Sequence, residues 1–258
     1  MLFDTHCHLY DGRFDEDRDE ILQDMEAQGI MPCVLVGADM PTSRDCCAMA
    51  RKRPWLYFAA GVHPHDAKDY TEAAHAELTS LMGDEKCVAW GEIGLDYYYD
   101  HSPRDTQREV FARQLDEATS LGKPVVFHVR DAHGDTTDIL RARQGALPQG
   151  VMHCYGGSVE QAKIYLDMGF YISLAGPVTF KNAAKLTDVA RMVPDDRLLI
   201  ETDSPYLSPE PVRGRRNDPR NVAHVARHMA LLRGVSYEAL CESTRQNGMR
   251  LFGISEGI

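Results

Sequence analysis

The chain has 258 residues and a formal net charge of −11 with its histidines neutral. A single barrel of this size is ordinary, so we expect residues 1–258 to form one domain. The acidic total argues against a general nucleic-acid coat protein, although it leaves room for a local basic site. No apolar run approaches the ~20 residues of a membrane span and no secretion leader precedes Met1, so we expect no membrane association.

The seven cysteines are odd in number and include no Cys-x-x-Cys pair. Most of them lie in apolar segments, which is typical of buried free thiols in a reducing compartment. We therefore expect a cytoplasmic protein. A monomer is the simplest expectation, and oligomers are left open.

Short apolar runs alternate with longer amphipathic segments along the chain. The apolar runs predict strands at about residues 2–8, 30–36, 55–61, 87–90, 124–127, 151–152, 170–174 and 197–200. The amphipathic segments predict helices at about residues 15–28, 41–52, 72–82, 103–121, 136–143, 158–168, 182–192, 221–232 and 236–251. Strands that alternate with helices imply a parallel sheet, so this order predicts a (β/α)8 TIM barrel.

Two helix starts carry recognisable residues. Ser102 and Pro103 predict the start of the long fourth helix, with Ser102 as N-cap and Pro103 at the first helical position. Five acids lie between Asp15 and Glu20. Because acids near a helix N-terminus oppose the positive end of its dipole, we interpret them as structural.

Metal-competent side chains gather where the predicted strands end. In the motif Asp4-Thr5-His6-Cys7-His8, side chains alternate faces, so both imidazoles can point at one metal ion. Later strands end in further candidates at the same end of the barrel, where barrel enzymes build their active sites. The full set is His6, His8, Glu92, His128, His153 and Asp203.

Four imidazoles and two carboxylates suit zinc or manganese, with magnesium possible through the carboxylates. Six ligands exceed the three or four that one zinc ion takes, so we expect two divalent ions per chain, bridged by Glu92. Such a pair can bind both an attacking water and a phosphoryl oxygen. Asp203 is a candidate to ligate one ion and to accept the proton of the water. Glu201 is a candidate ligand or ligand partner, and Asp4 can orient a ligand histidine or make a structural hydrogen bond.

These residues lie in motifs that resemble those of the TatD family of metal-dependent deoxyribonucleases, within the amidohydrolase-type barrel superfamily. The resemblance covers essentially the whole chain. The matching motifs are Asp4-Thr5-His6-Cys7-His8, Gly61-Val62-His63-Pro64, Gly91-Glu92-Ile93-Gly94-Leu95-Asp96-Tyr97, His128-Val129-Arg130-Asp131-Ala132, His153-Cys154-Tyr155-Gly156-Gly157, Glu201-Thr202-Asp203-Ser204-Pro205-Tyr206-Leu207 and Arg213-Gly214-Arg215-Arg216-Asn217-Asp218-Pro219. One departure is Asp218, where the family usually has Glu.

The resemblance implies metal-dependent hydrolysis of phosphodiester bonds in DNA, often exonucleolytic, and we expect single strands as the substrate. RNA is left open as a second substrate. The resemblance also implies the same six metal ligands. It further implies a substrate-binding role for His63 and for the arginine segment. From the chemistry, we expect Asp203 and Glu92 to be the catalytic residues.

The only dense basic run of this acidic chain follows the last predicted strand. It comprises Arg213, Arg215, Arg216 and Arg220. Its position near the predicted metal site favours phosphate binding, by Arg213, Arg215 and Arg216, over a solvated loop. Aromatic residues in or near loops at the same end, on which bases can stack, are Tyr97, Tyr155, Phe180 and Tyr206.

Other patterns point elsewhere. His224 and His228 lie four apart on a predicted outer helix that lacks the Glu of a His-Glu-x-x-His zinc site. His65, His101 and His133 lie in loops that can border the site, with weaker claims than His63. No phosphate loop, dinucleotide fingerprint or serine-hydrolase elbow occurs. Two alternatives stay open: a hydrolase of a small ester, lactone or amide on the same barrel, and a metal-stabilised interaction protein without turnover.

Overall fold

A computed structural model describes residues 1–255 of the chain. Its eight strands form one sheet in the order β1 to β8, and neighbouring strands run parallel. The strands are β1 (Leu2–Cys7), β2 (Ile30–Val36), β3 (Leu56–Ala60), β4 (Cys87–Asp96), β5 (Val125–Arg130), β6 (Gly150–Met152), β7 (Tyr171–Leu174) and β8 (Leu198–Ile200).

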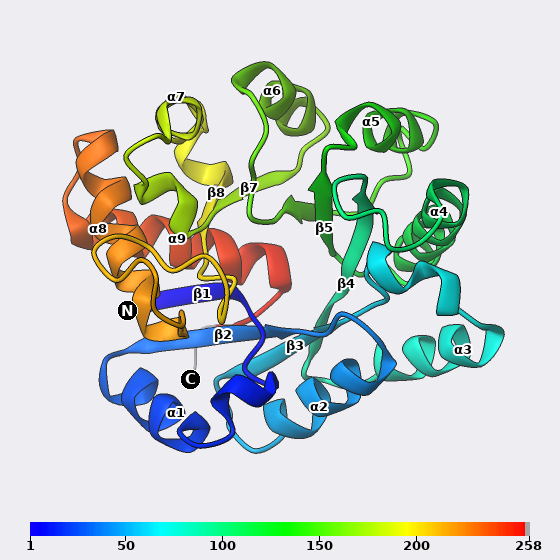
Figure 1. Ribbon diagram of the computed structural model, residues 1–258, viewed down its shortest axis with the longest axis horizontal. Helices are drawn as coiled ribbons and strands as arrows, with labels where there is room; N and C mark the ends of the chain where they lie inside the picture. Colours follow the sequence, from blue (N-terminus) through cyan, green and yellow to red (C-terminus); the bar gives the residue numbers. More distant parts are fainter. Residues whose placement is uncertain (256–258) are drawn as a thin grey trace.

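Helices follow the strands and surround them. Figure 1 shows α1 to α8 arranged in chain order around the sheet. The α-helices of residues 1–255 are α1 (Arg18–Ala27), α2 (Met40–Ala50), α3 (Glu72–Leu81), α4 (Arg104–Ser120), α5 (His133–Arg141), α6 (Val159–Asp167), α7 (Ala184–Met192), α8 (Val222–Arg233) and α9 (Tyr237–Phe252). None of these helices is both long and apolar enough to cross a membrane.

The sheet nearly closes on itself, because β1 meets β8 and the segment that follows it. The Thr5 hydroxyl donates to the Ile200 carbonyl at 3.0 Å. Beyond β8, the Asp203 N–H donates to the His6 carbonyl at 2.9 Å, and the His8 N–H donates to the Ser204 carbonyl at 2.7 Å. The predicted (β/α)8 TIM barrel is therefore confirmed. That residues 1–258 act as a single domain stays a prediction.

The last helix packs on an apolar core formed by the strands. Met249 and Phe252 of α9 belong to the same buried cluster as Phe3, Val34 and strand residues of the other units. Full burial of one such side chain stabilises a fold by about 1.5–3 kcal/mol. Because Phe3 lies near the start of β1, α9 covers the end of the barrel where the strands begin. The opposite end, where the strands finish, carries the candidate site.

Several predicted boundaries differ from the structure. The predicted N-cap at Ser102 is wrong, because α4 begins one residue later with Pro103 as its N-cap. The Ser102 hydroxyl instead donates to the His65 carbonyl at 2.7 Å and accepts from the Lys68 N–H at 3.1 Å. Ser102 thus ties the loop after β4 to the loop after β3, a long-range contact that local helix signals do not reveal.

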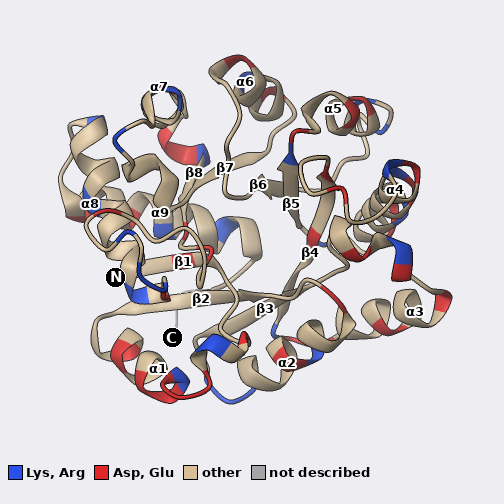
Figure 2. Ribbon diagram, in the orientation of Figure 1, with Lys and Arg blue, Asp and Glu red and all other residues tan. Residues whose placement is uncertain are grey.

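The acids before α1 are shared between two roles. Asp19 lies in the first turn of α1, as the dipole interpretation expects. Asp15 and Asp17 precede the helix and pair with Arg18 and Arg216 instead. Figure 2 shows acidic residues on α1, α3 and α4, so the negative charge of the chain is spread over its outer helices.

Candidate metal centre

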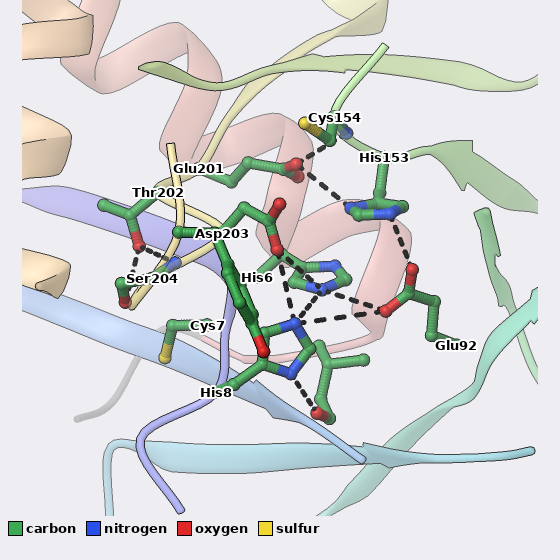
Figure 3. Close-up of polar contacts among 12 residues, drawn as sticks. His6, Cys7, His8, Glu92, His153, Cys154, Glu201, Thr202, Asp203 and Ser204 are labelled. Atoms are coloured by element: carbon green, nitrogen blue, oxygen red, sulfur yellow. Dashed lines mark hydrogen bonds and ion pairs between the residues drawn. The ribbon is translucent and has the colours of Figure 1, made fainter. Parts of the chain in front are cut away.

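Four predicted ligands meet in a first group at the end of β1. The Nε2 atoms of His6 and His8 lie 3.1 Å apart. Oε2 of Glu92 lies 3.4 Å from the His6 nitrogen, and Oδ1 of Asp203 lies 3.3 Å from the His8 nitrogen. Figure 3 shows these side chains converging from three different strand ends. Each of the two nitrogens lies within 4.0 Å of both carboxylate oxygens, which is a donor set suited to one divalent ion.

Hydrogen bonding fixes which nitrogen of His8 faces this group. Its Nδ1 lies 2.8 Å from the Val36 carbonyl, which can only accept, so Nδ1 carries the proton. Nε2 is therefore the nitrogen that faces the two carboxylates and that a metal ion would bind once it is deprotonated. For His6, Nδ1 is buried and finds no hydrogen-bond partner within residues 1–255.

A second group lies on the other side of Glu92. Oε1 of Glu92 is 2.7 Å from Nδ1 of His128 and 2.8 Å from Nε2 of His153. The two nitrogens are themselves 3.4 Å apart. Glu92 therefore directs one oxygen at each group, as a carboxylate shared by two cations would.

Carboxylates behind the second group hold its histidines. Nε2 of His128 donates to Asp96 at 3.1 Å, and Nδ1 of His153 donates to Glu201 at 3.3 Å. Each back nitrogen donates its proton to a carboxylate, so the front nitrogen is the one that faces Glu92. The front nitrogen donates to Glu92 here, and it would have to release that proton to bind a metal ion. Carboxylate–histidine pairs of this kind commonly orient metal ligands.

The buried carboxylates are poised to be anionic. Burial alone would raise the pKa of Glu92, but the charge of His153 and hydrogen bonds from the histidines hold it well below its ordinary value. Burial would likewise raise the pKa of Asp203, but the His8 hydrogen bond and the nearby imidazoles keep it below its ordinary value. Negative charge at both positions attracts cations at neutral pH.

Asp203 reaches the site through an unusual backbone conformation. Its φ of 55° lies in the left-handed region, which costs most residues about 1–3 kcal/mol but which Asp tolerates better than others. The N–H of Asp203 is held by the His6 carbonyl. This turn directly after β8 brings the carboxylate back toward His8.

Gly94 lets β4 run close to β5. It pairs with His128 and has a φ of 150°, and a Cβ at Gly94 would lie 1.9 Å from the His128 carbonyl oxygen. A side chain there would push the two strands apart. The close approach is what brings Glu92 within reach of the His128 ring.

His63 presents a proton to the site, unlike the ligand candidates. Its Nδ1 accepts from the His65 N–H at 3.1 Å, so the neutral ring carries its proton on Nε2. Burial, together with the charge of His128, lowers the pKa of His63 well below its ordinary value. Nε2 lies 3.6 Å from Oε1 of Glu92, which directs this N–H at the same centre.

The chain matches a protein family along nearly its whole length. The model of the TatD family, described as TatD related DNase, matches residues 3–253. The chain belongs to the TatD family. The resemblance that the motifs indicated is therefore confirmed.

Relatives of this TatD-family protein carry names of enzymes. A Bacillus subtilis (strain 168) protein named uncharacterized metal-dependent hydrolase YabD is 44% identical, over 99% of this chain and 100% of its own length. The 3'-5' ssDNA/RNA exonuclease TatD of Cronobacter sakazakii is 34% identical over 97% of each chain. The crystal structure of YJJV, a TatD homolog from Escherichia coli K12, covers 98% of each chain with a TM-score of 0.92 at 27% identity. The protein is thus a metal-dependent hydrolase of the TatD family, which confirms the predicted enzyme class.

Asp4 makes hydrogen bonds to the backbone and to Thr202, in keeping with the structural role that was one of the two left open for it. Its buried carboxylate accepts from the Thr202 N–H at 2.9 Å, from the Thr202 hydroxyl at 2.6 Å and from the His6 N–H at 3.3 Å. Burial raises its pKa to about 8 despite these bonds. Asp4 therefore ties the backbone of β1 to the segment that carries Asp203.

The arginine run of this TatD-family hydrolase divides into two kinds of residue. Arg216 forms an ion pair with Asp17 and is already partly neutralised. Arg213 lies 4.1 Å over the ring of Phe180, and Arg215 is exposed. Among the residues that the structure describes, neither of these two arginines has a carboxylate partner. Arg213 and Arg215 therefore carry positive charge that no carboxylate within residues 1–255 neutralises and that a substrate phosphate could pair with.

One expectation about a neighbouring residue is corrected, and one residue at the site was missed. Tyr155 cannot stack with bases, because it is buried and its hydroxyl donates to the Ser158 carbonyl. Asp96, absent from our candidate residues, touches the site through His128. A signal for it existed, since side chains two apart on a strand share a face and Asp96 stands four residues beyond Glu92 on β4. His224 and His228 lie on α8, outside the groups with metal-ligand spacing found in residues 1–255.

Proposed function

We propose that this TatD-family hydrolase cleaves phosphodiester bonds of single-stranded DNA or RNA with two divalent ions per chain. The observation that supports this most directly is the division of the Glu92 carboxylate. Its Oε2 faces His6 and His8, whereas its Oε1 faces His128 and His153. Two cations bridged by one carboxylate suit the displacement of a leaving oxygen from phosphorus.

In this proposal, some residues bind the metal ions and one accepts a proton. His6, His8 and Asp203 would hold one ion, and His128 and His153 the other, with Glu92 shared. When bound, such ions polarise the phosphoryl group and make hydroxide available near neutral pH. Asp203 is anionic at neutral pH and lies beside the first ligand group, so it would accept the proton of the attacking water.

Other side chains act on the substrate. His63 donates a hydrogen bond from its Nε2–H to a phosphoryl oxygen. Arg213 and Arg215 bind phosphates farther along the strand. Asp96 and Glu201 keep the ligand histidines in orientation from behind. Magnesium, manganese and zinc all fit this mixed nitrogen and oxygen donor set.

One group of relatives supports a nuclease over a hydrolase of small esters. The similar protein from Cronobacter sakazakii is named a 3'-5' ssDNA/RNA exonuclease, and it aligns with 97% of this chain. We therefore propose exonucleolytic removal of nucleotides from a single strand. Cytoplasmic location and the monomeric state stay predictions.

A labelled single strand tests this function. Chelator-treated protein is incubated with a 5'-labelled oligonucleotide and with Mg²⁺, Mn²⁺ or Zn²⁺, and the products are sized over time. We expect stepwise shortening that requires metal, that Glu92→Ala abolishes and that His224→Ala, a histidine outside the site, leaves unchanged. Metal-dependent hydrolysis of a lactone or small ester with intact oligonucleotide would contradict the proposal.

A further inference from the structure

Two exposed tyrosines stand at the end of β4, next to the candidate metal centre. Tyr98 and Tyr99 are 58% and 51% exposed. Their N–H groups donate to Asp96 at 3.0 and 2.8 Å, and the same carboxylate holds His128. The guanidinium of Arg130, at the end of β5, lies 3.9 and 4.7 Å from the centres of the two rings. We call Tyr98, Tyr99 and Arg130 the β4 platform.

The β4 platform continues toward the site through histidine rings. The ring of Tyr99 contacts His65 edge to face at 5.4 Å and lies parallel to His101 at 5.5 Å. His65 in turn packs against His63 at 4.3 Å. An exposed aromatic surface therefore lies one imidazole away from a residue that faces Glu92.

A third exposed tyrosine stands beside the other ligand group. Tyr206 follows β8, is 48% exposed and lies with its ring 6.0 Å from the ring of His8. Its N–H donates to the Asp203 carbonyl at 3.0 Å, and the guanidinium of Arg13 lies 4.5 Å from its ring centre. We call Tyr206 and Arg13 the β8 platform.

The two platforms lie on opposite sides of the barrel. The strand order runs from β1 to β8 around the barrel, so the ends of β4 and β5 lie half a turn from those of β8 and β1. Glu92 lies between them, since one of its oxygens faces His8 and the other faces His128. A chain of nucleotides that crosses Glu92 would thus pass from one platform to the other.

We propose that each platform stacks one unpaired nucleobase, so that a single strand lies across the metal centre with a base held on either side of the reacting phosphate. This proposal rests on the proposed phosphodiesterase function. Aromatic rings and arginine planes bind bases by stacking without regard to sequence. The two faces of a base in a duplex are already covered by its stacked neighbours, so the platforms would favour single strands.

The test combines changes in the protein with changes in the strand. The variants are Tyr98→Ala with Tyr99→Ala for one platform and Tyr206→Ala for the other. The substrates are hexathymidylate and two analogues, each lacking one of the two bases that flank the first bond cut by the parent enzyme. The readout is kcat/KM for that first cut.

Controls separate stacking from folding and from chemistry. Replacing the three tyrosines with Phe keeps the rings. Tyr57→Ala is the control for loss of a tyrosine elsewhere. Tyr57 lies near the start of β3, at the opposite end of the barrel, and the ammonium of Lys86 lies 4.6 Å from the centre of its ring. Methyl p-nitrophenyl phosphate, a small phosphodiester without a base, reports on the metal centre alone.

We expect each platform variant to lower kcat/KM on hexathymidylate by at least about fivefold, the lower end for loss of one stacked base. On the analogue that lacks the base stacked by a given platform, the variant of that platform should have the same kcat/KM as the parent enzyme. On the other analogue, its kcat/KM should still be lower than that of the parent. The Phe variants, Tyr57→Ala and the small substrate should stay within about twofold.

Equal losses on all three strands, or no loss on any, would overturn the platforms while leaving the nuclease intact. Equal losses on the small substrate would also overturn them, because the tyrosines would then act on the metal centre. Failure of the parent enzyme to cut either hexathymidylate or its RNA counterpart, hexauridylate, would refute the proposed function itself. The two proposals therefore fail in different ways.

Discussion

At the scale of single residues, Asp203 is both a candidate metal ligand and the candidate acceptor of the water's proton. Asp203→Asn keeps the size of the side chain but removes its negative charge and most of its basicity. We expect turnover on a single strand to fall by at least ~100-fold, the lower end of general acid–base contributions, with the fold intact. Asp167→Asn, an exposed aspartate at the end of α6, is the matched control. Unchanged turnover with metal still bound would show that Asp203 takes no part in the chemistry.

A separate prediction concerns Asp96, because its carboxylate contacts His128 but no residue of the first ligand group. Asp96→Ala removes the acceptor that holds the back nitrogen of His128, so we expect one of two metal affinities to weaken by ~10–100-fold. Titration calorimetry on chelator-treated protein measures both affinities. Asp96→Asn, which keeps an oxygen acceptor, should lose less. Equal weakening of both sites, or of neither, would mean that Asp96 does not orient a ligand.

At the scale of elements, the loop after β8 carries the basic run. Each phosphate neutralised on a single strand contributes ~0.7 to the slope of log affinity against log salt. Arg213→Gln with Arg215→Gln should therefore flatten that slope by up to ~1.4, two contacts at ~0.7 each. Arg216→Gln, whose arginine is paired with Asp17, is the internal control and should change the slope little. A slope unaltered in the double variant would make the run a solvated loop.

The contact between β4 and β5 predicts a loss of stability. Gly94→Ala would set a Cβ 1.9 Å from the His128 carbonyl oxygen at a φ that side chains rarely adopt. We expect it to lower the free energy of unfolding by more than ~1 kcal/mol and to weaken metal binding through His128. Gly134→Ala in α5 has open space around it and should be neutral or stabilising. Urea unfolding of both variants measures the difference, and equal stabilities would refute the close-approach interpretation.

At the scale of the whole molecule, periodic features were predictable and long-range pairings were not. Apolar runs and the residues that end them predicted the barrel and the set of six ligands, because parallel strands finish at one end. The sequence did not reveal that Arg216 is engaged by Asp17, almost two hundred positions away, or that Ser102 bonds the loop after β3. Exposure was equally hidden, since Tyr155 and Tyr98 both follow strands and only Tyr155 is buried.

Two ions bridged by Glu92 are the central claim for this TatD-family hydrolase. The most direct measurement follows the rate of single-strand hydrolysis while metal is added back to chelator-treated protein and the ions bound per chain are counted. Two-ion catalysis predicts little activity at one ion per chain and full activity as the count approaches two. It also predicts that Glu92→Ala disrupts both sites. Full activity at a count that never exceeds one ion per chain would contradict it.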